Sequence, residues 1–332
     1  MFILENYALA VIFLVITMLC WGSWPNTFKL TRNEWRFELF YWDYVLGIVL
    51  LSIILGFTLG SNGEYGRALL DDLAQVEKEH IVSAMVAGAI FNLANILFMA
   101  AIALAGMSVA FPVGGGLALI LGVVINYINA PMGDPYYLFG GVALITAAII
   151  LSATASKKLQ TKLQKLSYKG ILLSIIAGTL FALFYSYLAT AMATDFKNPE
   201  AGKMTPYSAV FIFSSGVLLS NIVLNTILMK KPIEGSPVSY SDYFGGSGRN
   251  HSMGIAGGMI WGLGLSLSII SAGQAGFAIS WGLAQGNAMI AAIWGVFIWK
   301  EFKEAPGGTN KLLALMFICY LTGLIAVILA KG

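Results

Sequence analysis

The chain has 332 residues, of which 58% are hydrophobic and 11% are charged, and its formal net charge is +3. Soluble globular domains carry about 25% charged residues, so this composition excludes a water-soluble domain and indicates an integral membrane protein. The mean hydropathy of +0.81 agrees with that class. The small net charge gives no reason to expect a nucleic-acid partner.

Cysteine and histidine are scarce in the chain. Cys20 and Cys319 lie inside apolar runs, where we expect no structural disulfide. His80 and His251 stand near charged loop residues and form no metal-binding pattern. The sequence therefore predicts neither a metal site nor another cofactor.

The first apolar run does not have the pattern of a secretory signal. It carries Glu5 in place of a basic segment and continues past the usual length of about 7 to 15 residues. It also has no small-residue cleavage site. We interpret it as a retained first helix.

Ten apolar runs are long enough to cross a bilayer, which takes about 20 residues as a helix. Two pairs of runs are nearly continuous, and we expect Gly106 and Gly273 to break them into tight helical hairpins. The ten predicted spans are 7–30, 38–60, 81–104, 107–129, 136–155, 169–193, 205–229, 252–272, 276–299 and 312–330.

Basic residues predict the orientation. Most of the Lys and Arg residues lie in the loops that follow odd-numbered spans, and few lie on the opposite side. By the positive-inside rule, both termini face outside. The acidic loop 61–80 is then external, which acidic residues do not prevent.

An internal repeat organises the ten spans. Residues 101–126 resemble residues 268–295, with Ala105-Gly106 opposite Ala272-Gly273 and Gly114 opposite Gly282. Because each half has an odd number of spans, the second half enters from the opposite face, as in the inverted repeats of secondary transporters. The sequence thus predicts an all-α membrane fold of two inverted five-helix repeats, 1–156 and 169–332, joined by a basic connector, 157–168.

The first hairpin, residues 20–47, is the most distinctive stretch. Pro25 removes a backbone donor near the end of the first span, and a broken helix at membrane depth is tolerated only against protein or a wet cavity. Next to this break stand Trp21, Trp24 and Asn26, which could stack on a ring-shaped solute and bond its polar groups.

Other polar and aromatic side chains lie on helical stripes of later spans. Asn92 and Asn95 share a stripe of the third span, and their amides could bind an uncharged polar solute. The alternative is that they bond neighbouring helices, as intramembrane amides often do. The remaining candidates are Tyr185, Trp261, Trp281 and Gln285.

Two acids stand at the start of the second span. Asp43 lies about 9 Å along the helix from its first residue, given a rise of about 1.5 Å per residue, and a carboxylate facing lipid there is costly. We predict that Asp43, with Glu38, carries a co-transported proton, or that sodium takes its place. The alternative is a salt bridge from Asp43 to Lys29 or Arg36.

Two connecting segments suggest other roles. The glycine-rich stretch 236–254 lacks the G-x-x-x-x-G-K-[ST] pattern of a phosphate loop, so we interpret it as a flexible linker. The basic connector is expected to touch anionic lipid heads. Trp35, Trp42 and Trp299 are expected as interfacial anchors.

Four motifs together resemble the ureide permease family of the drug/metabolite transporter superfamily: W-G-S-W-P-N-T at 21–27, F-Y-W-D-Y at 40–44, F-N-L-A-N at 91–95 and A-F-P-V-G at 110–114. Related bacterial sugar permeases for rhamnose and glucose share the ten-helix plan. The resemblance implies a proton-linked carrier for small neutral nitrogenous compounds such as allantoin or nucleobases. The plant members carry a long central loop with a phosphate motif, and the corresponding segment here is short.

We therefore predict a secondary transporter in a bacterial inner membrane that imports a small uncharged polar metabolite by alternating access. A rhamnose- or glucose-type sugar permease stays an alternative because the central loop differs. A drug or metabolite exporter is a second alternative, since such proteins also use a membrane-embedded acid. A membrane enzyme or sensor is not favoured, because the predicted spans hold no His, metal triad or paired acids.

Overall fold

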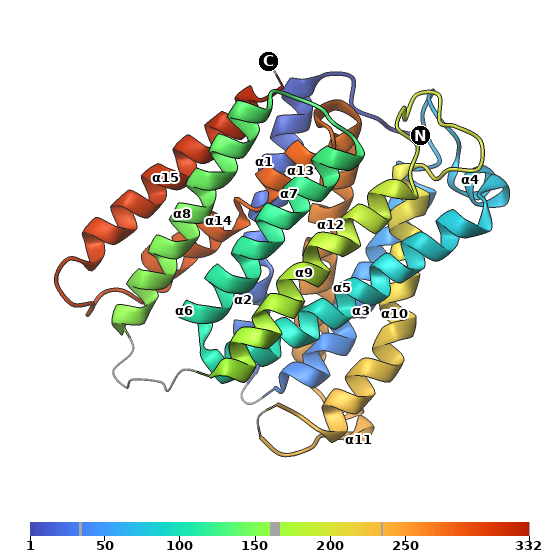
Figure 1. The fold of residues 1–332 in the computed structure, drawn as a ribbon. Helices are drawn as coiled ribbons and strands as arrows, with labels where there is room; N and C mark the ends of the chain where they lie inside the picture. Colours follow the sequence, from blue (N-terminus) through green and yellow to red (C-terminus); the bar gives the residue numbers. More distant parts are fainter. Residues whose placement is uncertain (33–34, 160–166, 234, 332) are drawn as a thin grey trace. The chain divides into compact units, whose positions relative to one another are not determined.

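The computed structural model describes residues 1–32, 35–159, 167–233 and 235–331. Over these ranges the protein is helical, apart from loops and an isolated bridge between Met192 and Met204 (Figure 1). Ten of the described segments are long and apolar enough to span a membrane. This confirms the prediction of an all-α, ten-span membrane protein, with boundaries that agree to about one helical turn.

Several spans consist of more than one helical piece. The first combines α1 (Tyr7–Ser23) and α2 (Pro25–Lys29), the fourth combines a π-helical turn, η1 (Phe111–Gly115), with α7 (Gly116–Asn129), and the ninth combines α13 (Phe277–Ala284), α14 (Asn287–Ile293) and η2 (Trp294–Ile298). The other spans are α3 (Phe37–Phe57), α5 (Lys78–Ala105), α8 (Pro135–Leu159), α9 (Tyr168–Thr190), α10 (Pro206–Lys230), α12 (Gly248–Ala275) and α15 (Thr309–Leu329). Short helices outside these spans are α4 (Leu69–Gln75), α6 (Met107–Ala110) and α11 (Tyr240–Phe244).

The predicted break at Pro25 is confirmed. Helix α1 ends at Ser23, and Pro25 occupies the first position of α2, where its missing N–H is not needed. Trp24 joins the two helices, and its backbone N–H still bonds the carbonyl of Cys20 at 3.0 Å. The kink therefore leaves the backbone hydrogen-bonded on the side of α1.

Single glycines make the two tight helical connections. Gly106 separates α5 from α6 with φ 79° and ψ 159°, and Gly276 separates α12 from α13 with φ 82° and ψ 154°. Only glycine adopts this region readily. The predicted break at Gly106 is confirmed, whereas the one at Gly273 is wrong, because Gly273 lies inside α12 and lets the ring of Phe196 pack against the helix.

The chain divides into two compact units. Unit 1 comprises residues 1–92 and 184–274, and unit 2 comprises residues 93–183 and 275–332. Each unit therefore takes helices from both halves of the sequence, and α5 and α9 contribute residues to both. These units are defined by contacts, whereas the predicted repeats, 1–156 and 169–332, are the two halves of the sequence. The repeats stay a prediction.

In unit 1, α3 packs antiparallel against α10, as Figure 1 shows. Near one end, the side-chain amide of Asn225 donates to the carbonyl of Glu38 at 2.9 Å, and near the other end the hydroxyls of Ser52 and Ser214 are 2.7 Å apart. Helix α12 crosses α3 on another side. There Gly258 touches the carbonyl of Tyr44, a backbone approach that no side chain at position 258 would allow.

In unit 2, α8 packs antiparallel along α15 (Figure 1). Gly141, early in α8, meets Gly323, late in α15, so the two backbones come close together. Helix α7 packs on α13, where the indole of Trp281 lies over Gly122.

The surfaces of these helices suit a lipid environment. On α15 the exposed apolar residues recur at helical spacing along one face: Leu315, Ile318, Leu321, Ile325 and Leu329. In water such a face would be an aggregation liability. In a bilayer it contacts acyl chains.

Candidate functional site

Trp261 on α12 is the centre of an aromatic cluster in unit 1. Its ring stacks on Phe91 of α5 at 4.3 Å between centroids, on Trp21 of α1 at 5.8 Å and on Phe213 of α10 at 6.2 Å. The side chain is only 6% exposed. A solute that stacks on Trp261 must therefore separate at least one of these ring pairs.

The residues around the Pro25 break join the same cluster. The indole N–H of Trp21 donates to the carbonyl of Trp261 at 3.1 Å, and the ring of Trp24 lies 4.6 Å from that of Tyr44. Asn26 donates to the carbonyl of Ser23 at 2.9 Å, a local bond that spans the kink. The two predicted tryptophans thus contribute ring faces to the cluster, while Asn26 supports the bend.

Asn92 is completely buried in a polar network within unit 1. Its Oδ1 accepts a hydrogen bond from the Tyr41 hydroxyl at 2.9 Å, and its Nδ2 donates to Ser220 Oγ at 3.0 Å. The network links α3, α5 and α10. Asn92 therefore bonds neighbouring helices, as the alternative interpretation of this residue predicted. Its role in substrate binding stays a prediction.

Tyr185 on α9 is also buried in unit 1. Its hydroxyl lies 3.2 Å from Ser268 Oγ on α12, and either group can be the donor. It belongs to the same packed interior as Trp261, since Phe184 beside it packs edge-on against Phe91 and at a tilt against Phe213.

The three remaining predicted binding residues belong to unit 2. The indole N–H of Trp281 on α13 donates to the carbonyl of Ala118 at 3.0 Å, which fixes the ring against α7. Gln285 is the residue that ends α13, and its half-buried side chain lies in the turn before α14. Asn95 is half-buried on α5.

Asp43 has a carboxylate that is almost fully buried inside a span. Tyr243 donates to its Oδ1 at 2.7 Å, and His251 Nδ1 lies 2.9 Å from its Oδ2. The carboxylate of Asp43 thus contacts Tyr243 and His251, and the alternative of a salt bridge to Lys29 or Arg36 is wrong. Both partners come from about 200 residues away in the sequence, beyond what local spacing could indicate.

The segment that supplies these partners is structured. Within stretch 236–254, Ser239 and Asp242 form a reciprocal capping box at the start of α11. Helix α12 begins at Gly248, four residues before the predicted span, so His251 lies in its first turn. The predictions of a flexible linker and of spans without histidine are therefore wrong.

Glu38 faces a different environment from Asp43. One carboxylate oxygen pairs with Arg36 Nη2 at 2.9 Å, and the other, Oε2, is buried without a partner among the described residues. Glu38 is therefore tied to a cation at the start of α3. Asp43 lies further along the helix and is held by neutral or titratable groups.

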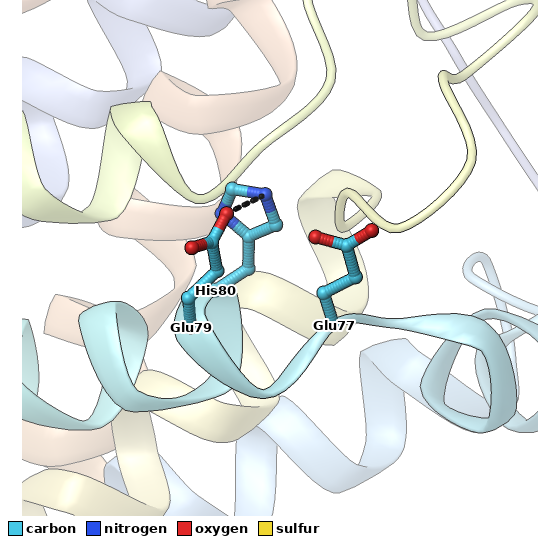
Figure 2. A group of neighbouring side chains, drawn as sticks. All are labelled: Glu77, Glu79 and His80. Atoms are coloured by element: carbon cyan, nitrogen blue, oxygen red, sulfur yellow. Dashed lines mark ion pairs between the residues drawn. The ribbon is translucent and has the colours of Figure 1, made fainter.

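Figure 2 shows a third group, at the start of α5: Glu77, Glu79 and His80. Each offers one ligand atom, and these atoms lie within 4.8 Å of one another, with His80 Nε2 at 3.6 Å from Glu79 Oε1. No motif in the sequence indicated this group. Both carboxylates are exposed, and the three residues are close neighbours in the sequence. We therefore assign this group no function.

Comparison with known proteins identifies the family. A family model described as ureide permease matches residues 40–169 and 155–331. Ureide permease 1 and ureide permease 2 of Arabidopsis thaliana are each 22% identical to the chain, over 100% of it and 99% of their own length. A probable ureide permease A3 of Vigna unguiculata is 21% identical over 91% of this chain and 97% of its own.

A solved crystal structure has the same fold. It aligns with a TM-score of 0.60 and 15% identity, and covers 98% of this chain and 99% of its own. The relatives above are named permeases rather than enzymes, which agrees with the ten spans. The chain, matched by the family model along most of its length, is a multi-pass membrane transporter and belongs to the ureide permease family.

Proposed function

We propose that this chain imports a small uncharged polar metabolite, of the ureide or nucleobase kind, as a secondary transporter driven by a proton gradient. The observation that carries the proposal is the end-to-end match to proteins named ureide permease. Sodium is the alternative coupling ion. The substrate class rests on these relatives, and the match favours a ureide over the sugar alternative.

We further propose that the transporter is built from two inverted five-helix repeats and works by alternating access. In three cases a span packs on its counterpart in the other half of the sequence: α3 on α10, α7 on α13 and α8 on α15. Helix α3 runs antiparallel to α10, and α8 runs antiparallel to α15, as inversion requires. The shared conformation of Gly106 and Gly276 also supports the repeat.

We propose that the substrate contacts come from aromatic rings and from amides that both units contribute. In unit 1 these are Trp21, Trp24, Asn26, Asn92, Tyr185 and Trp261, and in unit 2 they are Asn95, Trp281 and Gln285. Flat rings would stack on the indoles, and amides suit a solute with both donors and acceptors. Because the Trp261 ring is stacked on other rings and the Asn92 amide is bonded to Tyr41 and Ser220, binding would couple to rearrangement within unit 1.

We propose that Asp43 carries the coupled proton and that Glu38 contributes through the Arg36 pair. A carboxylate buried in a span is costly, so such residues usually mark functional sites, and Asp43 has the contacts of a group that can exchange a proton. The charge distribution of the loops supports both termini outside, with α11 on the cytoplasmic side. We place the protein in a bacterial inner membrane as part of this proposal.

Reconstituted protein tests the function directly. Purified full-length chain in liposomes is assayed with allantoin, uracil, a nucleoside, rhamnose and glucose, first by thermal stabilisation and then by uptake of the labelled solute. We expect stabilisation and uptake with a ureide or a nucleobase, and stronger accumulation when the outside is acidic. Selective uptake of a hexose would support the sugar permease, and expulsion of solute from loaded vesicles against its gradient would support an exporter.

The Asp43→Asn variant tests the coupling. It should still exchange substrate across the membrane at equal pH, but it should not accumulate substrate in response to a proton gradient. Accumulation that is unchanged in this variant, or that follows a sodium gradient instead, would remove proton coupling through Asp43.

A further inference from the structure

We propose that His251 exchanges the proton of Asp43 with water on the α11 side of the membrane, while Tyr243 holds the carboxylate in place for the transfer. The inference rests on the proposed proton-coupled transport and adds two residues to it. It starts from a mismatch in exposure: the side chain of Asp43 is 2% exposed, whereas that of His251 is 26% exposed. Asp43 needs an intermediary to reach water, and His251 is in contact with both.

The geometry suits a single proton transfer. His251 Nδ1 lies 2.9 Å from Asp43 Oδ2, a hydrogen-bond distance. In one state an imidazolium faces a carboxylate. In the other state the proton has moved from Nδ1 to Oδ2, which leaves a neutral imidazole and a carboxylic acid. Exchange with water goes through the first state: the imidazolium releases its Nε2 proton to water, which leaves a neutral ring with its Nδ1–H facing the carboxylate, and uptake of a proton at Nε2 restores the imidazolium.

Imidazole is suited to this role because its charge changes between about pH 5 and pH 8 without any special environment. Among the described residues, no other side chain that bonds Asp43 is an imidazole. Tyr243 lies outside the spans, and burial together with the Asp43 carboxylate raises its pKa above the usual range. Its hydroxyl therefore stays protonated and acts as a fixed donor to Oδ1.

Packing contacts fix the positions of Asp43 and His251. His251 and Gly254 lie one turn apart on α12, and Gly254 packs directly against the Asp43 side chain, where a larger residue would collide. The rings of Trp35 and Tyr243 stand edge-on to the imidazole at 5.6 Å and 5.0 Å between centroids. Trp35, expected as a lipid anchor, thus forms a wall of this site.

The other charged groups of the described elements nearby have partners of their own. Arg249, on the same turn of α12, donates to the carbonyl of Leu30. On α11, Asp242 is bonded to Ser239, and at the start of α3 Arg36 pairs with Glu38. Asp43 is therefore the acid to which the His251 ring is directly bonded.

The test separates proton transfer by His251 from a purely structural role of this side chain. His251→Asn keeps a donor near the position of Nδ1 but cannot carry a proton, and His80→Asn is the matched control elsewhere in unit 1. Each variant and the wild type, in liposomes, is measured by exchange of labelled allantoin at equal pH and by accumulation driven by a pH gradient. Exchange needs no net proton movement, so it reports transport alone.

We expect His251→Asn to retain exchange within about twofold and to lose driven accumulation by about tenfold or more, as expected when a proton-transferring group is removed. Asp43→Asn should behave alike, and His80→Asn should match the wild type in both assays. If His251→Asn accumulates substrate like the wild type while Asp43→Asn does not, His251 merely supports the fold and the inference fails. If wild-type protein shows no exchange of allantoin or uracil, the proposed function fails instead.

A second readout needs no change at position 251. The chain has two histidines, so in His80→Asn protein labelled with [15N]histidine the NMR signals come from His251 alone. We expect those signals to shift when Asp43→Asn is added, because the ring then loses the carboxylate that lies 2.9 Å from its Nδ1. Signals that stay unchanged would overturn the direct contact on which the relay depends.

Discussion

Gly106 and Gly276 share one backbone conformation, φ 79° with ψ 159° and φ 82° with ψ 154°, and each directly follows a helix of 28 residues. Side chains are strained in this region by about 1–3 kcal/mol. We expect Gly106→Ala and Gly276→Ala each to lower the unfolding temperature in detergent. Gly115→Ala is the control, because it is helical and open space surrounds its Cβ position. Equal unfolding temperatures for all three would contradict the strain.

Asp72 connects α4 to the start of α10 outside the spans. It is fully buried, with Oδ1 accepting from Arg67 Nε at 2.7 Å and Oδ2 accepting from the backbone N–H of Thr205 at 2.7 Å and from the hydroxyl of Ser208. Asp72→Ala removes the acceptor of Arg67 Nε and of the buried Thr205 N–H, so the free energy of unfolding should fall by about 3 kcal/mol or more. Asp71→Ala, exposed on the same helix, should change little, and chemical denaturation compares the two.

The bond between Tyr41 and Asn92 can be measured by a double-mutant cycle. Tyr41→Phe leaves Asn92 Oδ1 buried without that donor, which costs about 1–3 kcal/mol. Asn92→Leu removes the bonds of the amide to Tyr41 and to Ser220. The Tyr41–Asn92 bond is then already absent, so the double variant should lose less stability than the sum of the two single variants. Tyr136→Phe, with Tyr136 87% exposed, controls for removal of a hydroxyl.

The same variants separate the two roles of Asn92. If its amide binds substrate, Asn92→Leu protein should no longer be stabilised by allantoin or uracil in a thermal-shift assay. Stabilisation equal to that of the wild type would leave Asn92 with interhelical bonding alone.

Trp261 should matter for both packing and transport. Trp261→Ala removes the ring on which three other rings stack, so we expect a loss of about 3–5 kcal/mol of stability. Trp261→Phe keeps part of the stacking surface and should keep more of the solute uptake. Trp299→Ala, at a residue 39% exposed, is the control, and similar uptake losses in all three variants would exclude a specific role for Trp261.

Asp242 gives a pH dependence outside the spans. Hydrogen bonds from the backbone and hydroxyl of Ser239 lower the pKa of its carboxyl. Since the folded pKa lies below the unfolded value of about 3.9, its stabilisation of α11 is complete above that value and is lost as pH falls through the folded pKa. Compared with wild type at the same pH, Asp242→Ala should exchange amide hydrogens of 239–244 faster near about pH 7 but not below about pH 3.

The ten spans and two of the three predicted helix breaks follow from local properties. Apolar length defines a span, and Pro25 and Gly106 act through their own backbone. The third break shows the limit of such reasoning. Gly273 and Gly276 both follow an alanine, and the choice between them depends on Phe196, which packs against α12 from a distant segment.

The candidate site was harder to predict for the same reason. Asp43 could be recognised from its position alone, because a carboxylate in an apolar run is unusual. Its partners Tyr243 and His251 lie in a stretch that has the composition of a linker. Tyr41 and Ser220, which bond Asn92, are likewise ordinary residues of their own helices, and only the tertiary packing gives them a role.

The near-parallel pair of Trp21 and Trp261, with an interplanar angle of 9°, provides an internal optical probe. Two indoles at this distance couple their strong far-ultraviolet transitions, which gives a paired signal in far-ultraviolet circular dichroism. Any solute or conformational step that separates them abolishes that signal. Movement of the kinked first span against α12 can thus be followed in unlabelled protein.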